Sequence, residues 1–251
     1  MSWSSQRKAF ILTSIGAVIF AVFAVTLISV LYKTPSCTDQ KKNQDETGID
    51  CGGSCSRLCT AEVAAPSIRF VRQLSPQNGR TDIIAYIDNT NAHAAVKNAA
   101  FKVTLYGADN IVVTSKTGTV NLPPASTVPL FIPNLFSGSQ PVVRAFLTFD
   151  ESSFVWYRLN EELPTLAVSD ARLSLGETPR LSAIVSNSEV LPMRGVPVVA
   201  TLFDAQNNVI AASGTVVDLP ASAAVPVVFT WNAPFSGIPA RYEIIPLVQL
   251  P

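Results

Sequence analysis

After residue 66 the chain repeats itself. The segment TLYGADNIVV at 104–113 matches TLFDAQNNVI at 201–210, and LPPASTVPLFI at 122–132 matches LPASAAVPVVF at 219–229. The offset stays near 96 to 99 residues over these and further blocks. This period is close to the length of one seven-stranded sandwich domain, about 100 residues, and is far longer than a solenoid unit. The repeat therefore predicts two successive domains of one fold.

The repeated segments alternate apolar and polar residues. In AFKVTLY, Phe101, Val103 and Leu105 alternate with polar or amphipathic neighbours, as in a strand with one buried face. GADN and DAQNN supply turn residues before the next apolar run, and LPPAS and LPAS cannot continue a central strand. We expect a mainly β fold with two tandem sandwiches, 66–160 and 165–251, joined by a short charged linker containing Pro164.

Several residues recur at matching places in the two copies, and with them the chain resembles FxLYD-type bacterial immunoglobulin-like domains. They are Asn89, Leu105, Tyr106, Val112, Leu122 and Pro129, with Asn187, Leu202, Phe203, Val209, Leu219 and Pro226 as their counterparts. The resemblance implies immunoglobulin-like β-sandwiches and says little about activity. Neither copy contains cysteine, so each sandwich depends on its packed core.

An uncharged apolar run extends from Ala9 to Tyr32. As a helix it would reach roughly 36 Å, enough for a hydrocarbon core of about 30 Å. A cleaved signal peptide is the alternative, but its apolar region is usually only about 7–15 residues long. The bulky Leu31 and Pro35 also make a poor cleavage site. We expect a single transmembrane helix at 9–32, with a cytoplasmic tail at 1–8 because Arg7 and Lys8 flank that side.

The four cysteines cluster just beyond this run. Cys37, Cys51, Cys55 and Cys59 follow a C-x13-C-x3-C-x3-C spacing, whereas zinc sites prefer paired hooks separated by a longer loop. Two disulfides fit better, and three pairings are open. Disulfides persist in oxidising compartments, so a cysteine-rich stalk at 33–62 indicates an extracytoplasmic location for the residues that follow.

The residues between the first two cysteines carry oxygen atoms of the kind that calcium prefers. The segment 39–50 has the length of an EF-hand loop, but Lys41, Gln44 and Asp50 occupy places that require other residues. It is therefore not an EF-hand.

The same segment resembles a short cysteine module of secreted and surface-anchored bacterial proteins, C-x-D-G-x2-N-x2-E-T-x2-D-C-G-G-x-C-x3-C. The matches are Asp39, Asn43, Glu46, Thr47, Asp50, Cys51, Gly52, Gly53, Cys55 and Cys59, while Gln40 replaces the usual glycine. The resemblance implies extracellular placement and makes Asp39, Asn43, Glu46 and Asp50 the candidate calcium ligands. A solvated acidic loop held by disulfides is the alternative interpretation.

The rest of the chain offers little chemistry. Lys+Arg and Asp+Glu balance at 18 each, so no global field would recruit nucleic acid. The sole histidine, His93, falls in an expected loop, and G-x-S-x-G, G-x-G-x-x-G and H-E-x-x-H are absent. Trp156, Tyr157 and Trp231 could form a sugar platform, but inter-sheet core is the favoured interpretation.

These patterns predict a single-pass cell-membrane protein rather than an enzyme. Its expected function is binding, adhesion or scaffolding outside the cytoplasm, with a protein or surface ligand as partner. The alternative is an accessory subunit of a membrane-bound enzyme or export complex whose catalysis lies in a partner. Calcium is the one candidate cofactor.

Overall fold

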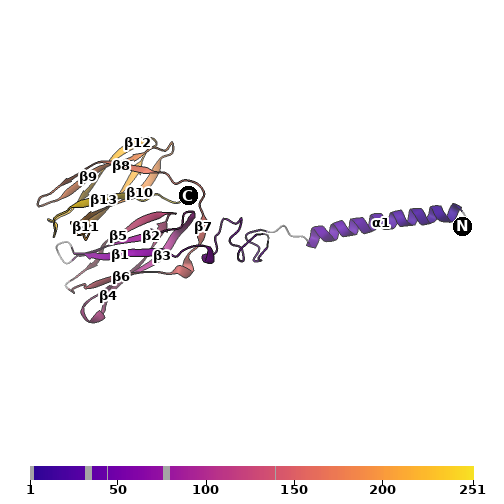
Figure 1. Ribbon diagram of the computed structural model, residues 1–251, viewed down its shortest axis with the longest axis horizontal. Coiled ribbons are helices and arrows are strands. Elements are labelled where there is room, and N and C mark those ends of the chain that lie inside the picture. Colours follow the sequence, from indigo (N-terminus) through magenta and orange to yellow (C-terminus); the bar gives the residue numbers. More distant parts are fainter. Residues whose placement is uncertain (1–2, 32–35, 44, 76–79, 139) are drawn as a thin grey trace. The chain divides into compact units, whose positions relative to one another are not determined.

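A computed structural model describes residues 3–31, 36–43, 45–75, 80–138 and 140–251 of the chain (Figure 1). The chain divides into two compact units, Met1–Cys55 and Ser56–Pro251. The fold is mainly β, with one apolar helix, several antiparallel sheets and two disulfides, which confirms the predicted fold class. Residues 1–2 of the expected tail, Tyr32 of the expected span and 33–35 of the expected stalk lie outside the described residues.

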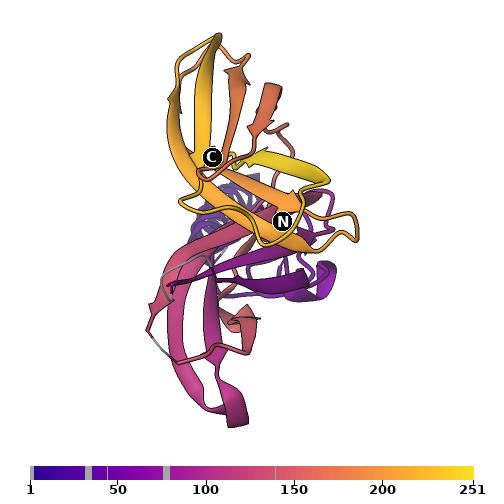
Figure 2. The same ribbon diagram turned by 90° about the vertical axis from the view of Figure 1, so that its left-hand side faces the viewer.

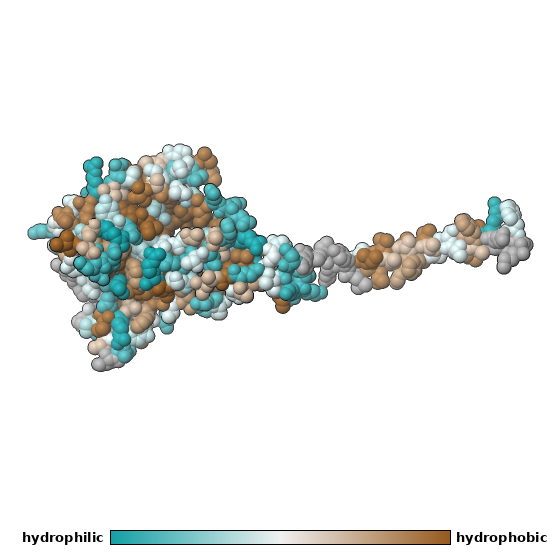
Figure 3. All heavy atoms as spheres, in the orientation of Figure 1, coloured by the Kyte–Doolittle hydropathy of each residue, from teal (hydrophilic) through white to brown (hydrophobic). Residues whose placement is uncertain are grey.

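The first unit contains helix α1, Trp3–Leu31. Its segment Arg7–Ser29 has a mean hydropathy of 2.6 and no buried residue, so it is long and apolar enough to cross a membrane. The Thr13 and Thr26 hydroxyls donate to carbonyls three and four residues earlier, so these polar groups are satisfied within the helix. Figure 3 shows mostly apolar side chains along it. These features are consistent with one membrane span.

The second unit begins with a sandwich of two sheets. One sheet has the order β1-β2-β5, formed by Ser67–Leu74, Arg80–Asn89 and Ser126–Ser137. The other has the order β4-β3-β6, and β7 also pairs with β3. Its strands are β3 (Ala94–Tyr106), β4 (Val112–Leu122), β6 (Arg144–Phe149) and β7 (Trp156–Arg158).

A single core fills the space between these two sheets. Phe101, Val103 and Leu105 of β3 are buried in it, while Lys102 is exposed, which confirms the alternation that the sequence predicted. Three short 3-10 helices, Thr60–Glu62, Ala108–Asn110 and Glu151–Ser153, lie in the connections of the second unit.

The remaining strands form a second sandwich with the same sheet orders. Order β8-β9-β12 corresponds to β1-β2-β5, and order β11-β10-β13 corresponds to β4-β3-β6. The strands are β8 (Leu166–Ser174), β9 (Arg180–Asn187), β10 (Met193–Phe203), β11 (Val209–Leu219), β12 (Ala223–Thr230) and β13 (Arg241–Pro246). A separate core containing Leu181, Val198 and Phe229 lies between its two sheets.

A third apolar cluster joins the two sandwiches. Ile84 and Tyr86 on the outer face of β2 pack with Val199 and Phe203 of β10 and Ala212 of β11. Strand β2 is therefore buried on both of its faces, and the four sheets of Ser56–Pro251 lie in successive layers (Figure 2). Whether the two sandwiches also fold as separate domains divided near Pro164 stays a prediction.

Candidate functional site

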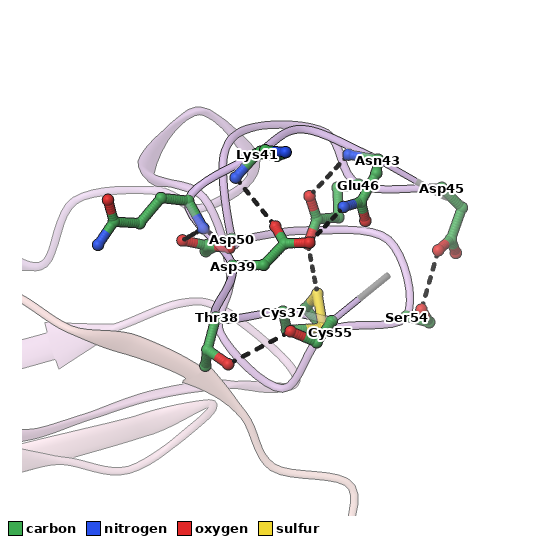
Figure 4. The surroundings of a disulfide bond; sticks show 12 residues. Cys37, Thr38, Asp39, Lys41, Asn43, Asp45, Glu46, Asp50, Ser54 and Cys55 are labelled. Atoms are coloured by element: carbon green, nitrogen blue, oxygen red, sulfur yellow. Dashed lines mark hydrogen bonds between the residues drawn. A yellow bond between two sulfur atoms is a disulfide. The ribbon is translucent and has the colours of Figure 1, made fainter. Parts of the chain in front are cut away.

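The cysteine-rich segment is closed by disulfides. Cys37 bonds to Cys55, with their Cα atoms 5.8 Å apart (Figure 4). Cys51 and Cys59 are disulfide-bonded as well. The two expected disulfides are thus present, and the pairing that the sequence left open is given by the Cys37–Cys55 bond. Gly53 has φ +57°, and a Cβ there would lie 2.2 Å from the backbone oxygen of Asp45. Only glycine fits this turn.

Three of the four predicted calcium ligands lie together in this segment. Asp39 accepts a hydrogen bond from Asn43 Nδ2 at 2.8 Å and another from the backbone of Lys41 at 3.0 Å. Glu46 Oε2 accepts from the backbone N–H of Asn43 at 3.1 Å. The Asn43 Oδ1 atom is buried without a hydrogen-bond partner, so one oxygen of the type that calcium binds is left over.

The fourth predicted ligand, Asp50, is held differently. Both of its carboxylate oxygens lie 3.0 Å from the backbone N–H of Gln40. Gln40 has φ +60°, the left-handed conformation that favours glycine. The segment thus offers Asp39, Asn43 and Glu46 as a partial oxygen set, and calcium binding stays a prediction.

Glu46 also faces the disulfide. Its side chain is buried, and its Oε1 atom lies 3.3 Å from Cys55 Sγ (Figure 4). A disulfide sulfur carries no proton, so this is a nonbonded contact and not a hydrogen bond. Among the described His, Cys, Asp and Glu residues, Cys37, Glu46 and Cys55 form the one group of three whose potential metal-binding atoms lie within 4.8 Å of one another. Because both sulfurs are in the disulfide, neither is a thiolate ligand in this state.

A polar cluster crosses the interface between the two sandwiches. Tyr86 Oη donates to Glu243 at 2.9 Å, and its ring stacks on Phe70 with ring centroids 4.8 Å apart. The Arg241 guanidinium lies 3.7 Å from the ring centroid of Phe203 and forms an ion pair with Glu243. Burial is the main cause that raises the pKa of Tyr86, and the Glu243 carboxylate adds to it. This cluster unites side chains about 160 positions apart, and no sequence motif indicated it.

A groove of about 740 Å³ opens beside this interface. One wall is β5 from Ser126 to Phe131, and the opposite wall is the chain from Ile245 to Leu250. Most of the other described residues that line it are apolar, a few are neutral and polar, and Lys97 is the only charged one. A volume of this size lies within the range of roughly 300–1,000 Å³ typical of ligand pockets.

The remaining residues considered at the sequence level do not form a site. His93 lies exposed in the loop between β2 and β3. Trp156 is buried in the first core and Trp231 packs against the second, which confirms the expected core role for these two side chains. The Tyr157 ring is partly buried, and the Lys97 ammonium lies 5.7 Å from its centroid.

Comparisons with known proteins add little. No family model matches the chain, and no curated protein is significantly similar to it. Among solved structures, red sea bream transglutaminase is similar with 13% identity and a TM-score of 0.27. The match covers 73% of this chain but only 29% of that enzyme's chain. A similarity at this level carries no argument about fold or activity.

Proposed function

We propose that this protein is a membrane-anchored, non-catalytic binding protein whose second unit lies outside the cytoplasm. The observation that carries the proposal is the succession of two features in the first unit. Helix α1 has no buried residue in its apolar segment Arg7–Ser29, and the segment that follows it contains disulfide-bonded cysteines. The first feature suits a lipid environment, and the second suits an oxidising compartment.

The charges near α1 support the orientation. Arg7 and Lys8 lie at its amino-terminal end, and positive residues beside a span stay on the cytoplasmic side. In the proposed orientation, the disulfide-bonded segment and residues 56–251 lie outside the cytoplasm. The repeated sheet order supports two tandem immunoglobulin-like sandwiches as the displayed part.

The second unit suits binding because it combines a stable body with an open groove. Three apolar clusters fix its four sheets, so the β5 wall of the groove is held by a packed strand, while hydrogen bonds of Leu247 and Gln249 hold the opposite wall beyond Pro246. Sites on such preorganised walls lose little conformational entropy when a ligand binds. The groove is mostly apolar with few polar groups, which is the composition common in ligand sites.

Labelling of lysines tests the orientation. Sealed right-side-out membrane vesicles that contain the full chain would be treated with a membrane-impermeant amine reagent and analysed by peptide mass spectrometry. We expect modification of the exposed Lys102 and Lys116 but protection of Lys8 until the vesicles are permeabilised. Labelling of Lys8 alone in sealed vesicles would show that the chain has the opposite orientation in the membrane. If the mature chain lacks α1, this helix is a cleaved signal peptide and not a membrane anchor.

Quantitative cross-linking in the same membranes tests the binding role. If the protein is a binding protein exposed outside the cytoplasm, it should be recovered cross-linked to extracytoplasmic ligands that contact its surface. Constant stoichiometry with one membrane enzyme, lost when that enzyme is deleted, would instead identify an accessory subunit.

A further inference from the structure

We propose that the groove beside β5 binds an extended, mostly uncharged peptide segment as an added antiparallel strand, with a carboxylate of that peptide next to Lys97. The proposal rests on the proposed function as a binding protein and names the class of ligand for its groove.

The groove exposes the edge of a strand and not merely one of its faces. Successive residues of a strand point to opposite sides of the sheet, so one face contributes only alternate residues to a wall. All six residues from Ser126 to Phe131 line the groove without interruption. Strand β5 also ends its sheet, since in the described part of the chain it pairs with β2 alone. Its outer backbone groups therefore face the groove.

The unpaired backbone identifies the kind of ligand. A free strand edge presents a row of N–H and C=O groups that an extended peptide can pair with. Six residues at about 3.3 Å each give an edge of roughly 20 Å, the length of an ordinary strand. Pro129 lies in the middle of this edge and has no N–H, so the added strand would bond to the groups on either side of it.

The opposite wall would cover the added strand. The chain from Ile245 to Leu250 also lines the groove without interruption. It is held in place because Leu247 N–H donates to Pro197 O at 2.8 Å and Gln249 Nε2 donates to Arg194 O at 3.1 Å. This fixed wall provides apolar contacts for the peptide side chains and leaves the β5 edge open.

Charge sets the direction of the peptide. Lys97 is the only charged residue in the lining, and it forms no salt bridge within the described residues. The backbone N–H of the neighbouring Asn98 donates to Asn121 Oδ1 at 2.9 Å, and Asn121 lies at the end of β4, shortly before Ser126 begins β5. A terminal carboxylate beside Lys97 would therefore make the peptide run opposite to β5. Antiparallel pairing is the more stable arrangement.

The test uses full-length protein in lipid nanodiscs and a fluorescent hexapeptide of alternating valine and threonine with a free carboxyl terminus. Anisotropy measures binding, and hydrogen exchange locates it. We expect saturable binding and slower amide exchange in 126–131. N-methylation of alternate peptide amides, which removes donors along one edge, should weaken binding about tenfold or more, equivalent to ~1.4 kcal/mol or more.

Two matched valine variants separate the groove from other apolar surface and from the lipid. Val248 lines the groove, so Val248→Trp should fill it and weaken binding about tenfold or more. Val143 is 52% exposed and is not part of the lining, so Val143→Trp should bind like wild type. The comparison is valid only if both variants keep the circular dichroism spectrum and the melting temperature of the wild-type protein.

A second pair of variants tests the charge. Lys97→Glu should weaken binding of the free-acid peptide several-fold, because the attraction between the lysine and the terminal carboxylate becomes repulsion. The variant should no longer bind the free-acid peptide more tightly than the carboxyl-amidated peptide. Lys116→Glu, which changes an exposed lysine outside the lining, should leave that preference intact.

Three results would overturn the proposal. They are no saturable binding, equal binding of methylated and unmethylated peptides, and a dimer that Val248→Trp disrupts without any peptide binding. The last result would assign the groove to a second copy of the chain. None of them would change the lysine-labelling pattern in membranes, so failure of this proposal is distinguishable from failure of the proposed function.

Discussion

Asn89 and Asn187 occupy corresponding places at the ends of β2 and β9, and each binds three backbone carbonyls through its side-chain amide. Asn89 Nδ2 donates to the carbonyls of Ala94, Leu122 and Pro123 at 2.8, 3.3 and 2.8 Å. Asn187 Nδ2 donates to those of Leu191, Leu219 and Pro220 at 3.0, 3.4 and 3.0 Å. Each Oδ1 atom accepts from the backbone N–H two residues later. Each asparagine therefore ties one sheet of its sandwich to the other.

Replacing either asparagine by aspartate should strongly destabilise its sandwich. The substitution keeps the shape but loses the donors and sets a buried carboxylate against carbonyl oxygens. We expect Asn187→Asp to lower the free energy of unfolding by about 3 kcal/mol or more, measured by urea denaturation. Asn232→Asp is the matched control, because Asn232 is exposed, and it should change stability by less than about 0.5 kcal/mol. Equal stability of the two variants would contradict this role for Asn187.

The two asparagines also indicate how much of the fold the sequence could predict. They recur in both copies of the repeat, as do the alternating residues of β3 and the prolines that follow β4 and β11. These features are repeated because each of them serves the packing within a single sandwich. Local patterns of this kind predicted the mainly β fold and the buried side chains of β3.

The packing of one sandwich on the other could not be predicted in this way. The run IIAYI in β2 is apolar without alternation because both faces are covered, but a sequence does not identify the covering sheet. Gly214 of β11 is a similar case, since a Cβ there would lie 3.2 Å from the ring of Phe131 in β5. In the cysteine-rich segment, the composition suggested four equivalent ligands. The hydrogen bonds of Asp50 to Gln40 depend on backbone geometry that composition does not reveal.

The Tyr86–Glu243 hydrogen bond should make stability depend on alkaline pH. Burial first, and Glu243 second, raise the pKa of Tyr86 above its ordinary value of 10.0, so the folded state keeps the phenol protonated. This contribution is fully present below pH 10 and is lost as the pH rises further, because only the unfolded chain releases the proton readily. Urea denaturation from pH 8 to 11 should therefore show a steeper loss of stability for wild type than for Tyr86→Phe. Parallel curves would show that Tyr86 does not titrate differently in the two states.

Gln40→Gly should stabilise the cysteine-rich segment. Gln40 has φ +60°, where a side chain costs roughly 1–2 kcal/mol and glycine costs none. Its backbone bond to Asp50 is kept in the variant, so amide exchange in residues 37–43 should slow about threefold or more. Gln40→Ala keeps the Cβ and should give no such protection. Faster exchange in the glycine variant would mean that the greater conformational entropy of the unfolded chain outweighs the relief of backbone strain at residue 40.

Calcium binding by the oxidised protein is tested by calorimetric titration. If Asp39, Asn43 and Glu46 contribute ligands, the titration should saturate, and Asp39→Asn should weaken binding because it removes a charge. Asp50→Asn should weaken it as well, through Gln40 and the loop. Asp45→Asn is the control, since the Asp45 carboxylate accepts from Ser54 Oγ at 2.8 Å outside this set. A flat titration up to millimolar calcium would leave the carboxylates as hydrogen-bond acceptors that shape the loop.

The contact between Glu46 and Cys55 should slow reduction of the Cys37–Cys55 disulfide. Reduction begins with attack by a thiolate, and the buried Glu46 carboxylate, 3.3 Å from Cys55 Sγ, repels that negative charge. The same carboxylate also opposes the negative charge that develops on Cys55 Sγ when this sulfur is the leaving group, which slows the exchange further. Glu46→Gln keeps an oxygen for the Asn43 N–H but is neutral. We expect it to accelerate reduction by dithiothreitol several-fold, measured by differential alkylation of Cys37 and Cys55.

Asp45→Asn is the matched control for this effect, since it removes an exposed carboxylate from the same loop without touching the disulfide. Its reduction rate should stay close to that of wild type. High salt should narrow the difference between wild type and Glu46→Gln only slightly, because a buried charge is poorly screened. If Glu46→Gln and Asp45→Asn accelerate reduction equally, general loosening of the loop is the cause, and the charge of Glu46 does not protect the disulfide.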